Sequence, residues 1–299
     1  MDIGEMQRKL AVWSTEQPER KFDPLLRLIA NREWLSEAAH KALSSAGAKT
    51  AGVDRVTRER LTPTLEHEID VLRRELLDGS YRPRPVRRVY IPKQNGKLRP
   101  LGIPTLRDRI VQRAMVMAME PIWESDFHRN SYGFRPKRSV HHAIQAVAAQ
   151  MTDTGRSRTK GRWAIEGDLA SYFDTVHHRK LVSCVKRRIH DRRFILVLWR
   201  LLRAGHVDAG IFHVSSAGVP QGGVISPLLS NIMLNELDQY MEENYVGAGA
   251  RNATRGWNAS VKKQTPIAVR EKREPRPRVS YARYADDSAP RRRREEAAL

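Results

Sequence analysis

The sequence predicts an α+β fold, with helices at the start of the chain and strands mixed with helices later. Two amphipathic segments with capping residues come first, at residues 23–46 and 62–78. An Asn-Gly hairpin signal follows at Asn95-Gly96, between two short runs that are typical of strands. Strands and helices then alternate without an internal repeat, and this order of elements favours an α+β architecture.

The two early helices are predicted from their caps and from apolar periodicity. Asp23-Pro24 begins the first helix and Gly47 ends it, in the expected order of cap, first-turn proline and terminal glycine. Thr62-Pro63 and Gly79 repeat this arrangement. The apolar faces comprise Leu25, Leu28, Ile29 and Leu35 in the first helix, and Leu65, Ile69, Leu72 and Leu76 in the second.

The middle of the chain predicts a β-hairpin and then a capped helix. Residues 86–91 and 98–103 form the expected strands, joined around the Asn-Gly turn. Thr105, with Asp108 three residues later, caps a helix that runs to Pro121.

Three later segments complete the expected order. Residues 163–168 read as a strand that leads into a helix, and Ser226-Pro227 begins one more helix. Residues 247–277 are rich in Gly, Pro, Lys and Arg and have little periodicity, so we expect an exposed insertion that touches RNA.

Composition favours a polyanion partner. The 299 residues include 54 Lys and Arg against 34 Asp and Glu, a net charge of +20 spread along the chain. Nucleic acid is the commonest polyanion, although charge alone also fits a ribosome-associated or membrane-surface protein. Cys184 is the only cysteine, which excludes a disulfide framework and a cysteine-rich zinc site. Without a secretory signal or an apolar run of membrane-spanning length, a soluble cytoplasmic protein is expected.

Three aspartates suggest a site for divalent metal. Asp168 ends a predicted strand, and Asp286 and Asp287 are adjacent. Phosphodiester synthesis uses two divalent ions, and carboxylates are the ligands that Mg²⁺ prefers. Adjacent residues on a regular strand face opposite ways, so both aspartates can serve only near a tight turn. Taken alone, each of these signals is better explained by a solvated turn or by a helix cap than by a metal site.

Five ordered blocks change that balance. They are residues 81–105, Ser131-Tyr-Gly-Phe-Arg-Pro-Lys-Arg-Ser139, Gly167-Asp168-Leu-Ala-Ser-Tyr-Phe-Asp174, Gly218-Val-Pro-Gln-Gly-Gly and the residues up to 231, and Arg283-Tyr-Ala-Asp-Asp287. In this order and spacing, they closely resemble the reverse transcriptase domain of bacterial group II intron-encoded proteins, over about residues 52–287.

The resemblance implies a right-hand polymerase with fingers and palm and a helical N-terminal extension. It divides the chain into an extension at 1–50, fingers at 51–160, a palm at 161–288 that contains the basic insertion, and an aberrant basic tail at 289–299. The thumb and maturase region of the family are missing from this division.

The resemblance also assigns roles to individual residues. Asp168, Asp286 and Asp287 match the metal-binding, catalytic aspartates that hold two Mg²⁺ ions, and Leu169 would lend a backbone carbonyl. Residues that match nucleotide-binding positions are Lys93, Arg99, Phe173 and Gln221. Phe173 is preferred over its neighbour Tyr172 as the aromatic that packs under the deoxyribose. For the two basic residues, ordinary surface charge is the plainer alternative, and for both rings it is ordinary core.

The sequence departs from the family in two places. Arg55 stands where glycine is common, a change expected in a surface turn. More serious, Asp287 is followed by Pro290 and then residues 291–294, all arginine. Proline cannot donate to a sheet ladder and four arginines give no buried face, so we expect an incomplete strand pair and a truncated chain.

Two functions follow from these observations. The first is an RNA-directed DNA polymerase that extends a DNA primer on an intron RNA template with Mg²⁺ and dNTPs. The alternative is a truncated, catalytically inactive remnant that only binds RNA. Neither function involves a membrane.

Overall fold

The computed structural model of the chain forms two compact units. It describes residues 1–92, 96, 98–151, 162–169, 171–246, 278–288 and 291–293. The first unit comprises Met1–Asp126 and Ser171–Met233, and the second comprises Phe127–Ala170 and Leu234–Leu299. Within the described ranges, no helix combines the length and the apolar character that crossing a membrane requires.

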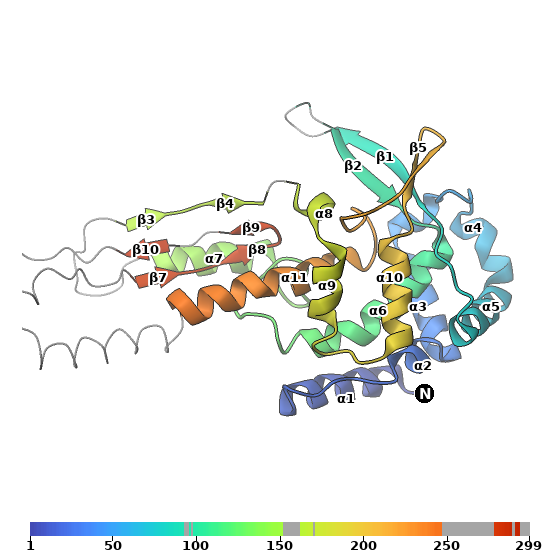
Figure 1. Ribbon diagram of the computed structural model, residues 1–299, viewed down its shortest axis with the longest axis horizontal. Coiled ribbons are helices and arrows are strands. Elements are labelled where there is room, and N and C mark those ends of the chain that lie inside the picture. Colours follow the sequence, from blue (N-terminus) through green and yellow to red (C-terminus); the bar gives the residue numbers. More distant parts are fainter. Residues whose placement is uncertain are drawn as a thin grey trace, which may run out of the picture. The chain divides into compact units, whose positions relative to one another are not determined.

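Helix α6 (Leu106–Trp123) is the centre of the first unit. Among the described elements, the helices with the most extensive contacts to α6 are α1 (Ile3–Glu16), α2 (Leu25–Ile29), α3 (Arg32–Ser44) and α5 (Leu65–Asp78), all of which are labelled in Figure 1. Thr105 caps α6 as expected, because its hydroxyl accepts a hydrogen bond from the Asp108 N–H at 3.2 Å. Gly79, with a φ of 80°, ends α5 in the left-handed conformation that glycine tolerates.

The first predicted helix is instead two helices with separate caps. Asn31 interrupts the helical run, since its side chain accepts from the Trp34 N–H and begins α3. Asp23 does not cap α2. Its place is taken by Asp191, whose carboxylate accepts from the Leu26 N–H at 2.7 Å. A cap from a residue so distant in the chain leaves no signature beside the helix that it stabilises.

The predicted hairpin is confirmed and belongs to a four-stranded sheet. Strand β1 (Val86–Pro92) pairs antiparallel with β2 (Leu98–Ile103) and parallel with β5 (His206–Asp208), and β6 (Ile211–His213) follows β5. The remaining short elements of the first unit are η1 (Ala46–Lys49), α4 (Arg58–Leu61), η2 (Thr62–Thr64), α8 (Tyr172–Thr175), α9 (His178–Val185) and α10 (Arg192–Leu202).

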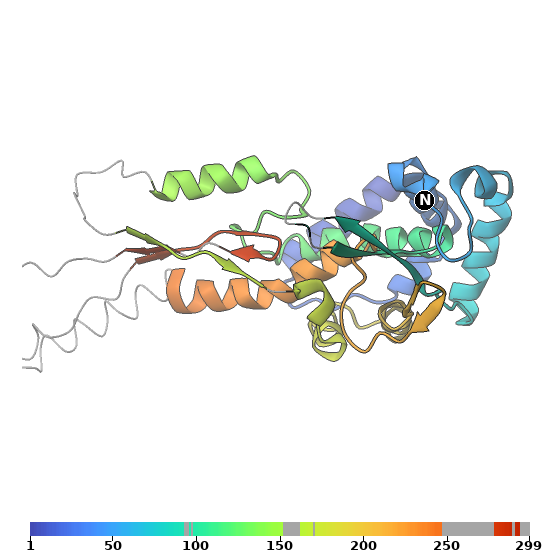
Figure 2. The same cartoon turned by 90° about the horizontal axis from the view of Figure 1, so that it is seen from above.

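The second unit contains a ribbon of three antiparallel chain segments. One segment is β3 (Arg162–Ala164) and β4 (Gly167–Asp168), the central one is β9 (Asp287–Ser288) and β10 (Arg291–Arg293), and the third is β7 (Arg278–Ser280) and β8 (Arg283–Tyr284). Figure 2 shows the ribbon between α7 (Val140–Met151) and the end of α11 (Ser226–Met241), which continues as η3 (Glu242–Val246). The boundary between the units falls within α11.

The second strand of the aspartate hairpin is present, contrary to expectation. Arg291 pairs with Ala164 and Ser288 pairs with Gly167, so the register is the same in both parts of the ribbon. The expectation of an incomplete strand pair is therefore wrong for the backbone of Arg291–Arg293. Ladder hydrogen bonds join backbone groups, and arginine supplies these as well as any other residue. Pro290 and the predicted insertion at 247–277 lie outside the described residues.

Candidate active site

Two of the predicted aspartates, Asp168 and Asp287, lie on adjacent strands of the ribbon in the second unit, and Asp286 lies in the turn between two of its strands. Asp168 at the end of β4 is the direct cross-strand partner of Asp287 at the start of β9. Asp287 also pairs with Tyr284, which leaves Ala285 and Asp286 as a two-residue turn. We call Tyr284–Asp287 the aspartate turn. It is the tight turn that two adjacent aspartates need if both are to serve one site.

The described carboxylates of this group are accessible to solvent. Asp168 is exposed and Asp286 is half-buried. Leu169, which directly follows Asp168, is 41% exposed. The side chain of Asp287 lies outside the described set, and within that set no three His, Cys, Asp or Glu side chains form a group that could hold a metal ion. All of the predicted ligands offer oxygen, which suits a hard cation such as Mg²⁺.

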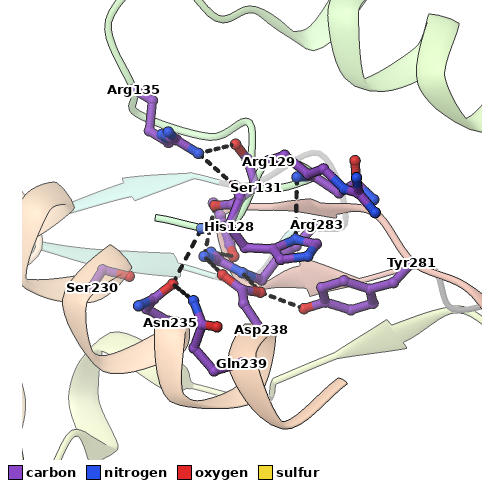
Figure 3. Close-up of polar contacts among 12 residues, drawn as sticks. His128, Arg129, Ser131, Arg135, Ser230, Asn235, Asp238, Gln239, Tyr281 and Arg283 are labelled. Atoms are coloured by element: carbon purple, nitrogen blue, oxygen red, sulfur yellow. Dashed lines mark hydrogen bonds and ion pairs between the residues drawn. The ribbon is translucent and has the colours of Figure 1, made fainter. Parts of the chain in front are cut away.

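A buried ion pair lies behind the aspartate turn (Figure 3). Arg283 is 1% exposed and Asp238, from α11, is 0% exposed. The Arg283 Nε and Nη2 donate to the two carboxylate oxygens of Asp238 at 2.8 and 2.6 Å. The Tyr281 hydroxyl donates to the same carboxylate at 2.7 Å. Burial, with Asp238 beside the ring, raises the pKa of Tyr281 above its ordinary value.

The segment that contains Ser131 runs beside the aspartate turn. The Tyr132 N–H donates to the Arg283 carbonyl and the Arg283 N–H donates to the Asn130 carbonyl, both at 2.9 Å. A Cβ on Gly133 would lie 2.3 Å from the Ala285 nitrogen, so the close approach requires glycine at this position. The second and fifth sequence blocks, far apart in the chain, thus meet at one turn.

The loop that holds Gln221 lies in the first unit. The Gly102 N–H donates to the Gln221 carbonyl at 2.6 Å, and the Gln221 side chain donates to Asp174 at 3.3 Å. Gly222 has a φ of 101°, and a Cβ there would lie 2.8 Å from the Gly102 oxygen. Glycine therefore brings the loop against β2, as the flanking glycines suggest.

A groove of about 440 Å³ opens beside this loop. Its polar lining includes Gln221, Asp174, Arg88, Tyr90 and His206. The volume is in the range of small-ligand sites, and the lining combines hydrogen-bonding, aromatic and basic groups. A nucleotide is one ligand class that such a lining could accept.

The other predicted nucleotide-binding residues differ in their surroundings. Tyr172 is buried and its hydroxyl donates to the Ser230 carbonyl at 3.1 Å, whereas Phe173 is half-buried. Phe173 thus keeps an accessible surface that Tyr172 lacks, although its role stays a prediction. Arg99 is exposed on β2. Lys93 lies outside the described residues.

Sequence reasoning missed the residues that support the aspartate turn. Arg283 is part of the fifth sequence block, but no motif contains or indicates its partner Asp238. A signal was present, because Asp238 is four residues after Leu234 on the apolar side of a predicted helix. Opposite charges at core positions of two elements indicate a buried pair, but the sequence does not reveal that these two elements meet.

Comparison with known proteins identifies relatives along most of the chain. Residues 91–291 match the family described as reverse transcriptase (RNA-dependent DNA polymerase). Protein YkfC of Escherichia coli K12 is 62% identical over 287 residues, which is 96% of this chain and 75% of that protein.

Intron-encoded proteins are more distant relatives. The group II intron-encoded protein LtrA of Lactococcus lactis is 35% identical over 76% of this chain, and the putative COX1/OXI3 intron 2 protein of Saccharomyces cerevisiae is 35% identical over 74%. The matched region is 37% and 25% of those proteins, respectively. The chain belongs to the group II intron reverse transcriptase and maturase family, whose members are RNA-directed DNA polymerases.

Proposed function

We propose that this chain extends a DNA primer on an RNA template, with Asp168, Asp286 and Asp287 holding two Mg²⁺ ions. The observation that carries the proposal is the register of the ribbon, which makes Asp168 the cross-strand partner of Asp287 beside a turn that contains Asp286. Like charges directly opposite each other destabilise a strand pair, so an arrangement of this kind favours bound cations.

The carboxylates have one task in this mechanism. They and the carbonyl of Leu169 would supply hard oxygen ligands at the end of β4 and in the aspartate turn. Bound divalent ions supply charge that lowers the pKa of the attacking 3′-hydroxyl and stabilises the leaving pyrophosphate.

Four residues are proposed to bind the incoming nucleotide. In sequence, Lys93 directly follows β1, and Arg99 is the second residue of β2. Their positive charges would attract a triphosphate. Gln221 would contact the sugar and base from the loop beside the groove. Phe173 would pack under the deoxyribose and leave no room for a 2′-hydroxyl.

The polymer substrates follow from family and charge. A net charge of +20 favours association with nucleic acid through phosphates. LtrA is described as a group II intron-encoded protein, and we propose that intron RNA is also the RNA that this chain binds.

Primer extension by the purified chain tests the proposal. The wild type, given a DNA primer annealed to RNA, Mg²⁺ and dNTPs, should add nucleotides, and EDTA should stop the reaction. Asp286→Asn keeps the size of the side chain, removes one charge and should reduce the rate by about 100-fold or more, as expected when a group central to catalysis is removed.

Binding of the same primed template distinguishes the outcomes. Asp286→Asn should bind the template as the wild type does, because the change is local. A folded wild type that binds the template and extends nothing would contradict polymerase activity and leave a protein that only binds RNA.

A further inference from the structure

The aspartate turn adopts a conformation that its own sequence does not favour. Two-residue hairpin turns prefer Asn-Gly, because both central residues often need a positive φ. Here the turn residues are Ala285 and Asp286, and Ala285 has a φ of 56°. A residue with a Cβ rarely adopts this left-handed conformation without support from its surroundings.

Arg283 gives that support. Its Nη1 donates at 2.7 Å to the Ala285 carbonyl, which belongs to the peptide group that joins Ala285 to Asp286. Its Nη2 donates to the Ser131 hydroxyl at 2.7 Å, in addition to its bond to Asp238. One guanidinium thus joins the turn backbone, the Ser131 segment and helix α11.

Asp238 holds the guanidinium of Arg283 in place. The two-point contact between the guanidinium fork and the carboxylate allows little rotation of the arginine side chain. The hydroxyl of Tyr281 donates to the Asp238 oxygen that also accepts a hydrogen bond from the Arg283 Nε. A buried charge pair is tolerated only when its remaining hydrogen-bonding groups are satisfied, and these contacts satisfy them.

We propose that Arg283 is a positioning residue. Held by Asp238 and Tyr281, it fixes the turn backbone so that the carboxylate of Asp286 is oriented for metal binding. The inference rests on the proposed function, in which Asp286 is a metal ligand. Groups behind a metal ligand orient it, and changing one typically lowers metal affinity 10- to 100-fold.

The first unit offers a matched control. The Tyr81 hydroxyl donates to the buried Asp108 at 2.6 Å, just as that of Tyr281 donates to Asp238 at 2.7 Å. Tyr281→Phe and Tyr81→Phe therefore remove the same atom from the same kind of bond. Only Tyr281→Phe acts on the network behind the aspartate turn.

Two measurements on the full chain test the proposal. Mn²⁺ binding is followed by electron paramagnetic resonance of the free ion, without nucleic acid or nucleotide. Primer extension is followed across Mg²⁺ concentrations, with the dNTP KM measured at saturating Mg²⁺. Circular dichroism melts of each variant establish that it is folded.

Arg283→Lys keeps a positive charge near Asp238 but cannot reach two carboxylate oxygens and the Ala285 carbonyl together. We expect it to weaken Mn²⁺ binding and to raise the Mg²⁺ requirement by about tenfold, with the dNTP KM unchanged. Tyr281→Phe should shift both quantities in the same direction by a smaller factor. Tyr81→Phe should change neither.

Unchanged Mn²⁺ affinity in folded Arg283→Lys would overturn the proposal, as would an equal shift in Tyr81→Phe. If Arg283→Lys does not fold, the Mn²⁺ affinities of Tyr281→Phe and Tyr81→Phe are compared. Equal affinities in these two variants would overturn the proposal. A wild type that extends no primer would contradict the proposed function, whereas the Mn²⁺ data would still test whether Arg283 sets the ligand.

Discussion

Phe173 is the half-buried aromatic next to the buried Tyr172, and we expect its ring to select the sugar of the nucleotide. Replacing it with alanine opens space where a 2′-hydroxyl would otherwise collide. Phe173→Ala should therefore raise the relative use of ribonucleotides by about tenfold or more, within the range that a shape-based pocket can discriminate. The ratio of kcat/KM for rNTP and dNTP measures this.

Tyr172→Phe is the control for the sugar-selection prediction, because it changes the adjacent ring without removing its bulk. It should leave the ratio near that of the wild type. A ratio unchanged in Phe173→Ala would mean that another residue excludes the 2′-hydroxyl.

Asp191 is a single carboxylate that caps two helices. It accepts from the N–H groups of Arg193 and Phe194 in α10 at 2.9 and 3.0 Å, and from Leu26 in α2. Asp191→Ala should lower the free energy of unfolding by about 2–4 kcal/mol, since a cap typically contributes about 1 kcal/mol and the N–H groups of Leu26 and Phe194 would lose their acceptor in buried positions. Urea unfolding gives the value.

Asp2→Ala is the matched control for Asp191, because Asp2 is an exposed cap that accepts one N–H, from Glu5. It should lower stability by less than about 1 kcal/mol. Equal losses in the two variants would mean that the contact of Asp191 with α2 adds nothing to the stability.

The N-terminal turn of α9 is joined to the loop before Gln221 by a buried histidine. The His178 Nε2 lies 2.7 Å from the Gly218 carbonyl, and burial lowers the pKa of this imidazole. The unfolded chain therefore takes up the proton first as pH falls below about 6.5. The stability that His178 contributes is present above that pH and is lost as the pH falls toward the folded pKa.

Unfolding at pH 7.5 and pH 5.5 tests the role of this histidine. Wild type should lose more stability over that interval than His178→Gln, with a difference in slope of at most about 1.4 kcal/mol per pH unit for one proton. The exposed His141→Gln should behave like the wild type. A parallel decrease in wild type and His178→Gln would exclude His178 as the cause.

Elements with local signals were predictable from the sequence, and those built by distant contacts were not. Helix α6 begins after its predicted cap Thr105, and α5 ends at its predicted stop Gly79. The other two ends differ from the prediction, since α5 begins at Leu65 after the short η2 and α6 continues past Pro121 to Trp123. The ribbon of the second unit is assembled from strands of two or three residues, which are too short to show any periodicity. Likewise, Arg283 and Asp238 become partners only when α11 packs against the ribbon.

The order of the five blocks carried the family assignment for the whole molecule, and the comparisons confirm it. The individual contacts of the site did not follow from that order. For example, the hydrogen bond from Gln221 to Asp174 joins a loop to helix α8, which lies 47 residues earlier in the chain. Motifs therefore indicated the chemistry, whereas the positions of the supporting groups required the fold.

The net charge of the whole molecule should make the proposed RNA binding dependent on salt. Basic residues exceed acidic ones by 20, and each phosphate contact releases counterions on binding. If about six to ten contacts form, raising KCl from 50 to 200 mM should weaken binding by about 10³- to 10⁵-fold. Fluorescence anisotropy with a labelled RNA measures the slope of log Kd against log salt. Asp286→Asn should keep that slope, because it removes no phosphate contact, and a Kd independent of salt would contradict binding through phosphates.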